Sequence, residues 1–383
     1  MNKLSPKALF AACIGAMALG LTTHSIAQDD SKAGMPAVSK SFLWNNGPIT
    51  FVDTTKFKKA PPYAIGFSNA SVSNLWALGY LHSLELAAEK NKGMIKKLIV
   101  TDANDNPTKQ VADIQDLMQR GVDILIVRPA TEAVDAAVNR AAKQGIPVIL
   151  GDRRTPSDNY VSYLTVDDWA QGRNMAQWLA EKLKGKGNVV LLAGMAGASP
   201  AEARIKAANE VFKQYPGIKV LDTQYTDWSP AKGKTVMAAM IQKYGKDING
   251  VWADHGLQAS GGIEAFTAAG YKPGEIPPFT CADLNACWIN AIKNKVPMMS
   301  LDNPPAGGGV ALETALKVLQ GQSVPHNLFI PTTITVTKGD ETPSIKADMP
   351  AEDYARLDKP GDLILSTGIP NYDPKTFKAD FPK

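Results

Sequence analysis

The chain has 383 residues, 44% of them hydrophobic, and its 41 basic residues nearly balance 37 acidic ones, giving a formal net charge of +4 at pH 7. A charge this close to balance excludes the strongly basic class of nucleic-acid-binding proteins and gives no reason to expect an anionic membrane as partner. The length suggests two domains, each large enough for its own hydrophobic core.

The first 27 residues have the pattern of a secretory signal peptide. Lys3 and Lys7 precede an apolar run over residues 8–21, and residues 25–27 supply small side chains at the cleavage spacing. We therefore expect export from the cytoplasm. Cys281 and Cys287 remain in the mature chain, and their separation permits a disulfide in an oxidising compartment. Two buried thiols are the alternative, because sequence separation does not fix the distance between the cysteines.

Short apolar runs alternate with amphipathic stretches from Tyr63 onward. The helical patterns between the runs, such as KQVADIQDLMQRG and EAVDAAVNRAAKQG, end in the glycine that often follows a helix. This alternation predicts an α/β fold with parallel sheets, and about ten strands suit two doubly wound, Rossmann-like sheets better than one. The runs expected to be strands are YAIGFS, KLIV, VDILIVRP, IPVILGD, NVVLLAG, IKVLDTQYT, NGVWADHG, PPFTCAD and PMMSLD.

Motifs of cofactor and catalytic sites are poorly formed. The KGKT of residues 232–235 ends like a phosphate loop, but no strand directly precedes it, and the chain has no GxSxG, HExxH or CxxC. DANDNPTKQVAD places oxygen ligands at calcium-loop spacing, but Pro107 stands where that loop needs glycine. We favour Asn106 as the cap of a helix with Pro107 at its first position. No cofactor, no metal and no catalytic activity are predicted.

Polar side chains follow strands in both halves of the chain. In an open α/β sheet the carboxyl ends of the strands face the crevice where ligands bind. We therefore predict two facing crevices lined with carboxylates and guanidinium groups, although any one of these residues would also suit a turn or a helix cap. The residues are Ser68 after YAIGF, Asp152 and Arg153 after IPVIL, Asp254 and His255 after NGVWA, Asp283 after PPFTCA, and Asp302 after PMMSL.

Two tryptophans accompany these polar groups. Trp76 falls just inside the helix after the first strand, and Trp228 follows IKVLDTQYT. Each is either a core residue or a stacking surface for a flat ligand. A sugar is the ligand that needs aromatic faces, carboxylates and guanidinium groups together, because its hydroxyls both donate and accept hydrogen bonds. The pattern therefore predicts a monosaccharide ligand.

Several segments in the same order resemble the type I periplasmic sugar-binding proteins of ABC importers, the group of the ribose and galactofuranose binders. The resemblance runs from about Tyr63 to Val336, and FSNASVSNLW is most similar to the galactofuranose type. ADH at residues 253–255 departs from the Asn-Asp that is common there. The segments are IGFSNASVSNLW, DANDNPTKQVADIQDLMQRGVDILIV, PVILGDRR, GMAGASPAEARIKAANEVF, DWSPAKGKTVM, VWADHGLQASGGIEAF and GGGVALETALKVLQG.

The resemblance implies a role for each predicted site residue. Asp152 and Arg153 would hold ring hydroxyls from the first lobe, and Arg204 would reach the ligand from the second. The resemblance also implies two lobes joined by three crossings of the chain, near residues 163–166, 281–303 and 336–339. The remaining assignments are Trp76 as a stacking residue, Trp228 as an aromatic that closes on the sugar, and Asp254, Asp283 and Asp302 at the strand ends of the second lobe and the hinge.

The boundaries that follow place lobe 1 at residues 59–164 and 303–337, and lobe 2 at residues 165–302 and 338–383, after an N-terminal extension of residues 28–58. The implied function is capture of a pentose or hexose, in pyranose or furanose form, by hinge closure in the periplasm. The implied partners are an ABC importer permease and, as a further candidate, a chemoreceptor; a monomer is expected. A sensory receptor for a small polar signal such as a furanosyl autoinducer, and a secreted glycan-cleaving enzyme, are the alternatives.

Overall fold

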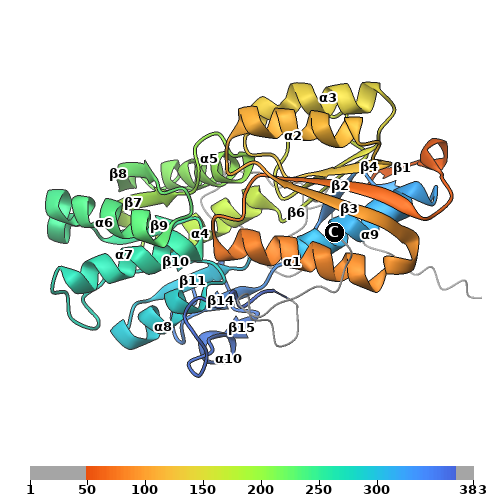
Figure 1. Cartoon of the computed structure of the whole chain (residues 1–383). Helices are drawn as coiled ribbons and strands as arrows, with labels where there is room; N and C mark the ends of the chain where they lie inside the picture. The colour runs from red at the N-terminus through yellow and green to blue at the C-terminus, as the bar shows by residue number, and fades with distance from the viewer. Residues whose placement is uncertain (1–48, 368–383) are drawn as a thin grey trace, which may run out of the picture. The chain divides into compact units, whose positions relative to one another are not determined.

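The computed structural model describes residues 49–367 and contains two main β-sheets, each with helices on both faces (Figure 1). The predicted signal peptide, residues 1–27, lies outside the described range, as do residues 368–383 of the tail. The α/β class with two doubly wound, mostly parallel sheets, predicted from the alternation of short and long apolar patterns, is confirmed. We call each sheet with its helices a lobe.

The first sheet has the strand order β13-β6-β5-β4-β2-β3, and every neighbouring pair is parallel. All residues of β4 and β5 are buried, as expected for strands covered by helices on both faces. The strand order reverses direction between β2 and β4, which is where such sheets bind ligands. The strands are β2 (Tyr63–Asn69), β3 (Ile95–Asp102), β4 (Ile124–Val127), β5 (Val148–Gly151), β6 (Ser162–Thr165) and β13 (Asn327–Phe329).

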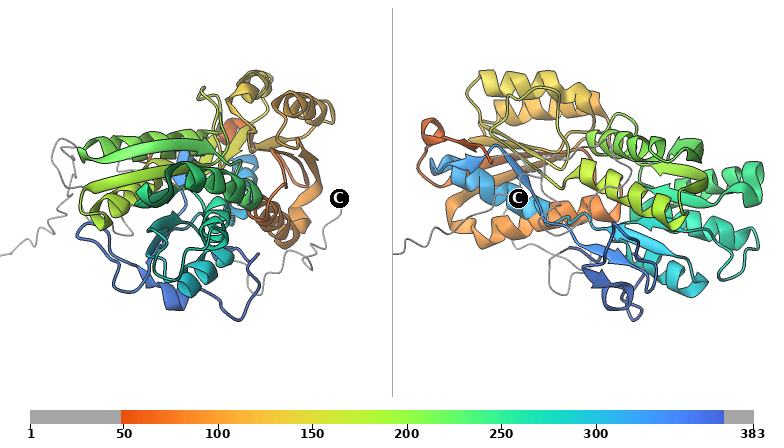
Figure 2. Two further views of the ribbon diagram at one scale, coloured as in Figure 1. Left: turned by 90° about the vertical axis from the view of Figure 1, so that its left-hand side faces the viewer. Right: turned by 180° about the vertical axis from the view of Figure 1, so that it is seen from behind.

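Helices α1 (Leu75–Lys90) and α9 (Gly307–Leu319) pack on each other at one face of the first sheet, and α2 (Pro107–Gln119) and α3 (Asp135–Lys143) cover the opposite face (Figure 2). The predicted cap of α2 is confirmed. The Asn106 side chain accepts hydrogen bonds from the backbone N–H groups of Thr108 and Lys109 at 2.9 and 3.1 Å. The oxygen-rich stretch before α2 therefore begins a helix.

The second sheet has the order β15-β14-β11-β10-β9-β7-β8, and its direction reverses between β7 and β9. Strand β14 runs antiparallel to β11, whereas the other neighbouring pairs for which a register is defined are parallel. The strands are β7 (Lys186–Ala193), β8 (Gly217–Tyr225), β9 (Gly250–Ala253), β10 (Phe279–Cys281), β11 (Met298–Leu301), β14 (Ile334–Val336) and β15 (Met349–Pro350).

The helices of the second lobe also form two layers. One layer contains α4 (Asp168–Lys182) and α5 (Ser199–Lys213), and the other contains α6 (Pro230–Tyr244), α7 (Gly256–Ala268) and α8 (Asn285–Asn294). A short helix, α10 (Ala351–Tyr354), follows β15. Single 3-10 turns complete the described elements: η2 (Thr55–Phe57), η3 (Lys92–Met94), η4 (Glu132–Val134) and η5 (Gly245–Asp247).

The chain passes between the two lobes at three places. The first two passages lie between β6 and α4, at residues 166–167, and between β11 and α9, at residues 302–306, and each overlaps the end of its expected range. The third lies between β13 and β14, at residues 330–333, and not at 336–339. Strand β14 hydrogen-bonds to β11, so residues 334–336 belong to the second lobe and not, as the sequence predicts, to the first.

The N-terminal extension and the C-terminal tail both pair with strands of the fold, although their polar composition suggests loose peripheral segments. Within the expected N-terminal extension, β1 (Phe51–Val52) pairs antiparallel with β12 (Val324–Pro325), next to the first lobe. The C-terminal tail contributes β15 to the second sheet, and Ile345 and Ile364 are buried. The tail therefore supplies part of the core of the second lobe.

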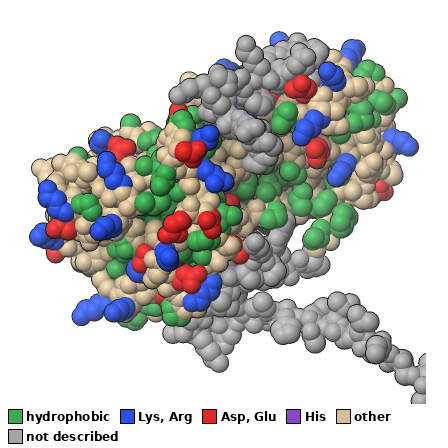
Figure 3. Space-filling view, turned by 90° about the horizontal axis from the view of Figure 1, so that it is seen from below, with side chains coloured by type: hydrophobic (Ala, Val, Ile, Leu, Met, Phe, Trp, Pro, Cys, Tyr) green, Lys and Arg blue, Asp and Glu red, His purple; other side chains and the backbone are tan. Residues whose placement is uncertain are grey.

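The surface contains both signs of charge. Basic and acidic side chains are interspersed on the face shown in Figure 3, in line with the near-balanced composition. Among residues 49–367, no helix is long and apolar enough to cross a membrane.

Candidate functional site

A cavity with about 330 Å³ of empty space, part of it open to solvent, lies at the carboxyl ends of strands from both sheets. Six of the predicted site residues line it: Trp76, Asp152, Arg153, Arg204, Trp228 and His255. The other lining residues are Asn74 and Arg128 from the first lobe, Pro200 and Leu257 from the second, and Asn303 from the second passage between the lobes.

A larger open groove lies elsewhere, at the amino ends of β7, β9, β10 and β11, and four lysines line it: Lys184, Lys186, Lys246 and Lys295. It contains none of the predicted site residues. Ligands of open α/β sheets bind at the opposite, carboxyl ends of the strands. The cavity between the strand ends is therefore the candidate site.

Asp152 and Arg153 directly follow β5, and both are buried. The backbone of Asp152 has φ 63°, a left-handed conformation that Asp tolerates better than most residues. The Tyr163 and Thr165 hydroxyls of β6 donate to the Asp152 carbonyl at 3.3 and 3.0 Å and hold it in place. Arg153 Nη1 donates to the carbonyls of two residues after β4, whereas its Nε makes no hydrogen bond within the described residues and lies 3.6 Å from Asp152 Oδ2. Arg153 therefore retains donors for a ligand.

Arg128 is a cavity residue that the sequence analysis did not single out. Its Nε donates to Asn69 Oδ1 at 2.8 Å and its Nη2 to the Ser71 carbonyl at 2.6 Å, while Nη1 lies 3.5 Å from Asp152 Oδ2. All three nitrogens thus face protein oxygens. Arg128 fixes the loop after β2 and the Asp152 carboxylate. Its sequence signal was the same as that of Asp152, a charged residue directly after a buried strand.

Arg204 projects from α5 and pairs with Asp168 at the start of α4. Nε and Nη2 of Arg204 lie 2.9 and 2.6 Å from Asp168 Oδ1, and Nη1 donates to the Asp254 carbonyl at 3.3 Å. Both partners are buried. Burial raises the pKa of the Asp168 carboxyl, because a charge loses its hydration there, and Arg204 acts in the opposite direction. The pair holds a guanidinium at the cavity with its charge largely compensated.

The two tryptophans approach the cavity from different lobes. The Arg153 guanidinium lies 5.0 Å from the centre of the Trp228 ring, a cation–π contact across the cavity. Trp228 Nε1 donates to Asp254 Oδ1 at 3.2 Å, and Trp76 Nε1 donates to the Asn303 carbonyl at 2.5 Å. Because both indole N–H groups are bonded within the protein, the rings offer the cavity their apolar surfaces.

Gly194, directly after β7, makes room for the Trp228 ring. A Cβ atom at this position would lie 2.1 Å from Trp228 Cε2. We expect Gly194→Ala to displace the indole and to lower the free energy of unfolding by about 1 to 3 kcal/mol. Urea denaturation followed by tryptophan fluorescence measures this loss. Gly93→Ala is the matched control, because a Cβ at residue 93 meets nothing within 4 Å; equal effects of the two substitutions would contradict the role of Gly194.

Four of the predicted site residues do not line the cavity. Ser68 is buried in β2, where its carbonyl accepts hydrogen bonds from Gln110 Nε2 and the Arg128 N–H. Asp254 supports Trp228 and accepts from the Gly194 N–H at 3.0 Å. The other two act at the passages between the lobes: Asp283 accepts from the Asn303 N–H at 3.3 Å, and Asp302 from the Thr333 N–H at 2.6 Å. These carboxylates hold the cavity walls instead of forming them.

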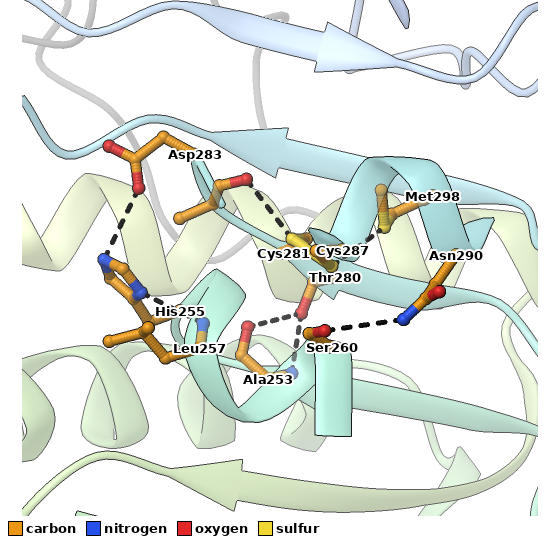
Figure 4. Close-up of a disulfide and its surroundings, with 11 residues drawn as sticks. Ala253, His255, Leu257, Ser260, Thr280, Cys281, Asp283, Cys287, Asn290 and Met298 are labelled. Carbon is orange, nitrogen blue, oxygen red and sulfur yellow. Dashed lines mark hydrogen bonds and ion pairs between the residues drawn. A yellow bond between two sulfur atoms is a disulfide. The ribbon is translucent and has the colours of Figure 1, made fainter. Parts of the chain in front are cut away.

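Cys281 and Cys287 lie beside this region and are joined by a disulfide (Figure 4). Cys281 ends β10 and Cys287 lies in α8, and both side chains are buried. Asp283 follows Cys281 by two residues and faces His255. The disulfide thus links β10 to α8 beside the carboxylate that supports the cavity wall. No cluster of metal-binding side chains occurs in the described part of the chain.

Residues 65–323 match the family model described as a periplasmic binding protein domain. The chain belongs to this family. The match covers the strands of both lobes that line the cavity, from β2 to β11, and excludes β14 and β15. The resemblance to type I periplasmic sugar-binding proteins of ABC importers, seen in the sequence segments, is confirmed. The members compared below are binding proteins and not enzymes, which sets aside the glycan-cleaving alternative.

Relatives of this periplasmic binding protein include sugar binders from several bacteria. It is 30% identical to a ribose import binding protein of Bacillus subtilis over 278 residues, 72% of this chain and 88% of the relative. It is 32% identical to the galactofuranose-binding protein of Escherichia coli over 56% of this chain and 69% of that protein. Among solved structures, the binding protein of the arabinose ABC transporter from Shewanella sp. ANA-3, bound to α- and β-L-arabinofuranose, has a TM-score of 0.65 and 25% identity, covering 71% and 91% of the two chains.

Proposed function

We propose that this protein captures one monosaccharide, a pentose or hexose in pyranose or furanose form, in the cavity between its lobes and delivers it to the membrane permease of an ABC importer. The main support for this proposal is the set of side chains that line the cavity. The cavity walls bring together three guanidinium groups, one carboxylate and two indoles, contributed by both lobes. Asp152 accepts from hydroxyl groups, Arg153 and Arg204 donate to them, and the indole faces pack on ring C–H groups.

We expect hinge closure because the residues that line the cavity come from both lobes. Arg153 comes from the first lobe and Trp228 from the second, so both reach one ligand only when the lobes approach each other. A ligand drives closure only to the extent that it binds the closed form more tightly than the open form. The closed form is then the shape that a permease recognises.

Delivery to a permease in the periplasm rests on the relatives and on the N-terminal sequence. The Bacillus subtilis relative is named for ribose import and the Shewanella protein for an ABC transporter. Residues 1–27 have the pattern of a signal peptide, which supports export. The import relatives favour transport over the sensory alternative.

A thermal-shift panel of monosaccharides and polyols tests the proposal. A ligand at 100 times its dissociation constant stabilises the native state by about 2.7 kcal/mol, which corresponds to roughly 4 °C in melting temperature for a protein of this size. We expect a shift of this magnitude with at least one pentose or hexose, and unchanged sugar on recovery. No shift with any member of the panel would count against the assignment.

A further inference from the structure

His255 lines the cavity, and both of its ring nitrogens lie next to protein groups. It caps the amino end of α7, where Nδ1 accepts a hydrogen bond from the Leu257 N–H at 3.3 Å. A neutral imidazole has one acceptor and one donor nitrogen, so Nε2 carries the proton. That nitrogen lies 3.5 Å from Asp283 Oδ1 (Figure 4). Burial lowers the pKa of His255 to about 3, so the ring is neutral.

The carboxylate that faces His255 is itself fixed. Asp283 Oδ2 accepts hydrogen bonds from the Asn303 N–H at 3.3 Å and from the Ser366 hydroxyl of the C-terminal segment. Asp283 is fully buried, and therefore cannot turn toward solvent. The two His255 nitrogens thus lie toward the Leu257 N–H and Asp283, and the remaining edge atoms of the ring are C–H groups.

The neighbours of His255 extend this apolar surface. Pro200, Trp228, His255 and Leu257, which we call the apolar wall, are all contributed by the second lobe. The Trp228 N–H is bonded to Asp254, and the polar lining residue of this lobe, Arg204, has Nε and Nη2 bonded to Asp168. The hydrogen-bonding groups of the first lobe, such as Asp152 and Arg153, face the ligand from the other side. The part of the cavity formed by the apolar wall therefore offers a ligand few hydrogen-bonding partners, whereas Arg204 of the same lobe and the polar groups of the first lobe supply such partners.

The geometry points to a deoxy sugar as the preferred ligand, bound with its hydroxyl-free carbon against the apolar wall. This inference rests on the proposed function and specifies its substrate class. A hydroxyl placed against Pro200, His255 and Leu257 loses its hydrogen bonds to water and regains none. We expect that loss to weaken binding by about tenfold or more. His255 is in this sense a specificity-determining residue.

Calorimetric titration of matched sugar pairs tests the inference. The panel contains each parent monosaccharide and its monodeoxy analogues at every position. The expected result is that the tightest ligand is a deoxy sugar and that its fully hydroxylated parent binds about tenfold more weakly. A fully hydroxylated sugar as the tightest ligand would overturn the inference but leave the proposed function intact. Absence of binding to any sugar would instead overturn the proposed function.

Substitution of His255 tests whether its imidazole ring sets the preference for a deoxy sugar. Asn is also a good helix cap, so His255→Asn keeps the start of α7 while offering the cavity a carboxamide. We expect the preference for the deoxy sugar over its parent to shrink by about tenfold. The reverse exchange at the cap of α2, Asn106→His, lies outside the cavity and leaves the preference unchanged. An unchanged preference in a folded His255→Asn protein would show that His255 does not set the specificity.

Discussion

Replacement of Arg204 with leucine is expected to lower the free energy of unfolding by about 3 to 5 kcal/mol at pH 8, even without ligand. Arg204 and Asp168 are both buried, and Nε and Nη2 of Arg204 lie 2.9 and 2.6 Å from Asp168 Oδ1. Removal of one partner of a buried ion pair leaves the other charge without compensation, and such losses are of this magnitude. Urea denaturation of the unliganded protein measures the change.

The loss should depend on pH in a defined direction. Burial raises the pKa of Asp168 above that of an unfolded carboxyl, and Arg204 opposes the rise. Without Arg204 the folded-state pKa rises further, so the buried carboxyl is protonated and neutral at low pH and becomes charged only as pH rises through that pKa. The destabilisation by Arg204→Leu is therefore expected to be smaller at pH 5 than at pH 8.

A double variant separates loss of the ion pair from loss of packing. Arg204→Leu combined with Asp168→Asn removes the orphaned charge, and we expect it to regain most of the lost stability at pH 8. If the double variant were as unstable as the single one at both pH values, the packing of the Arg204 side chain, and not its charge, would be what stabilises the protein.

The general position of the site was predictable from the sequence, because parallel strands bring their carboxyl ends to one edge. GDRRTP after a buried strand gave Asp152 and Arg153, and the structure brings both to the cavity. Whether a strand-end carboxylate faces the cavity or supports a neighbour is decided by tertiary contacts. Asp254 and Asp283 carry the same sequence signal as Asp152, yet they accept hydrogen bonds from Trp228 and from the Asn303 N–H.

Tertiary contacts that the sequence does not show also explain why Arg128 was not predicted and why the third passage between the lobes was misplaced. Arg128 follows ILIV just as Asp152 follows VILG. The neighbouring sequence does not reveal that the Arg128 side chain is buried with three protein contacts and not exposed to solvent. The third passage between the lobes was misplaced because β14 (Ile334–Val336) has strand composition and fits either sheet. Its pairing with β11 is a long-range choice, set by the open edge of the second sheet. Pattern and composition therefore predict elements better than the partners of those elements.

Replacement of Arg153 with alanine is expected to weaken sugar binding by about 100- to 1000-fold. Arg153 Nη1 is bonded to the Pro129 and Ala130 carbonyls, and its buried Nε has no hydrogen-bond partner in the described chain. Two charge-assisted hydrogen bonds to a ligand, at about 1.5 to 3 kcal/mol each, account for a loss of this size. Calorimetric titration with the best sugar of the thermal-shift panel measures it.

The adjacent Arg154 provides the matched control for this experiment. Its side chain is exposed, contacts Asp158 at 3.4 Å and does not line the cavity, so Arg154→Ala should change the affinity by less than about threefold. The melting temperature of unliganded Arg153→Ala should stay close to that of the wild type. Burial, with a smaller contribution from nearby Arg128, lowers the pKa of Arg153 to about 10, so hydration lost by this guanidinium offsets much of what its contacts contribute. A large fall in that melting temperature would identify Arg153 as a structural residue, and the loss of affinity would then carry no information about ligand contact.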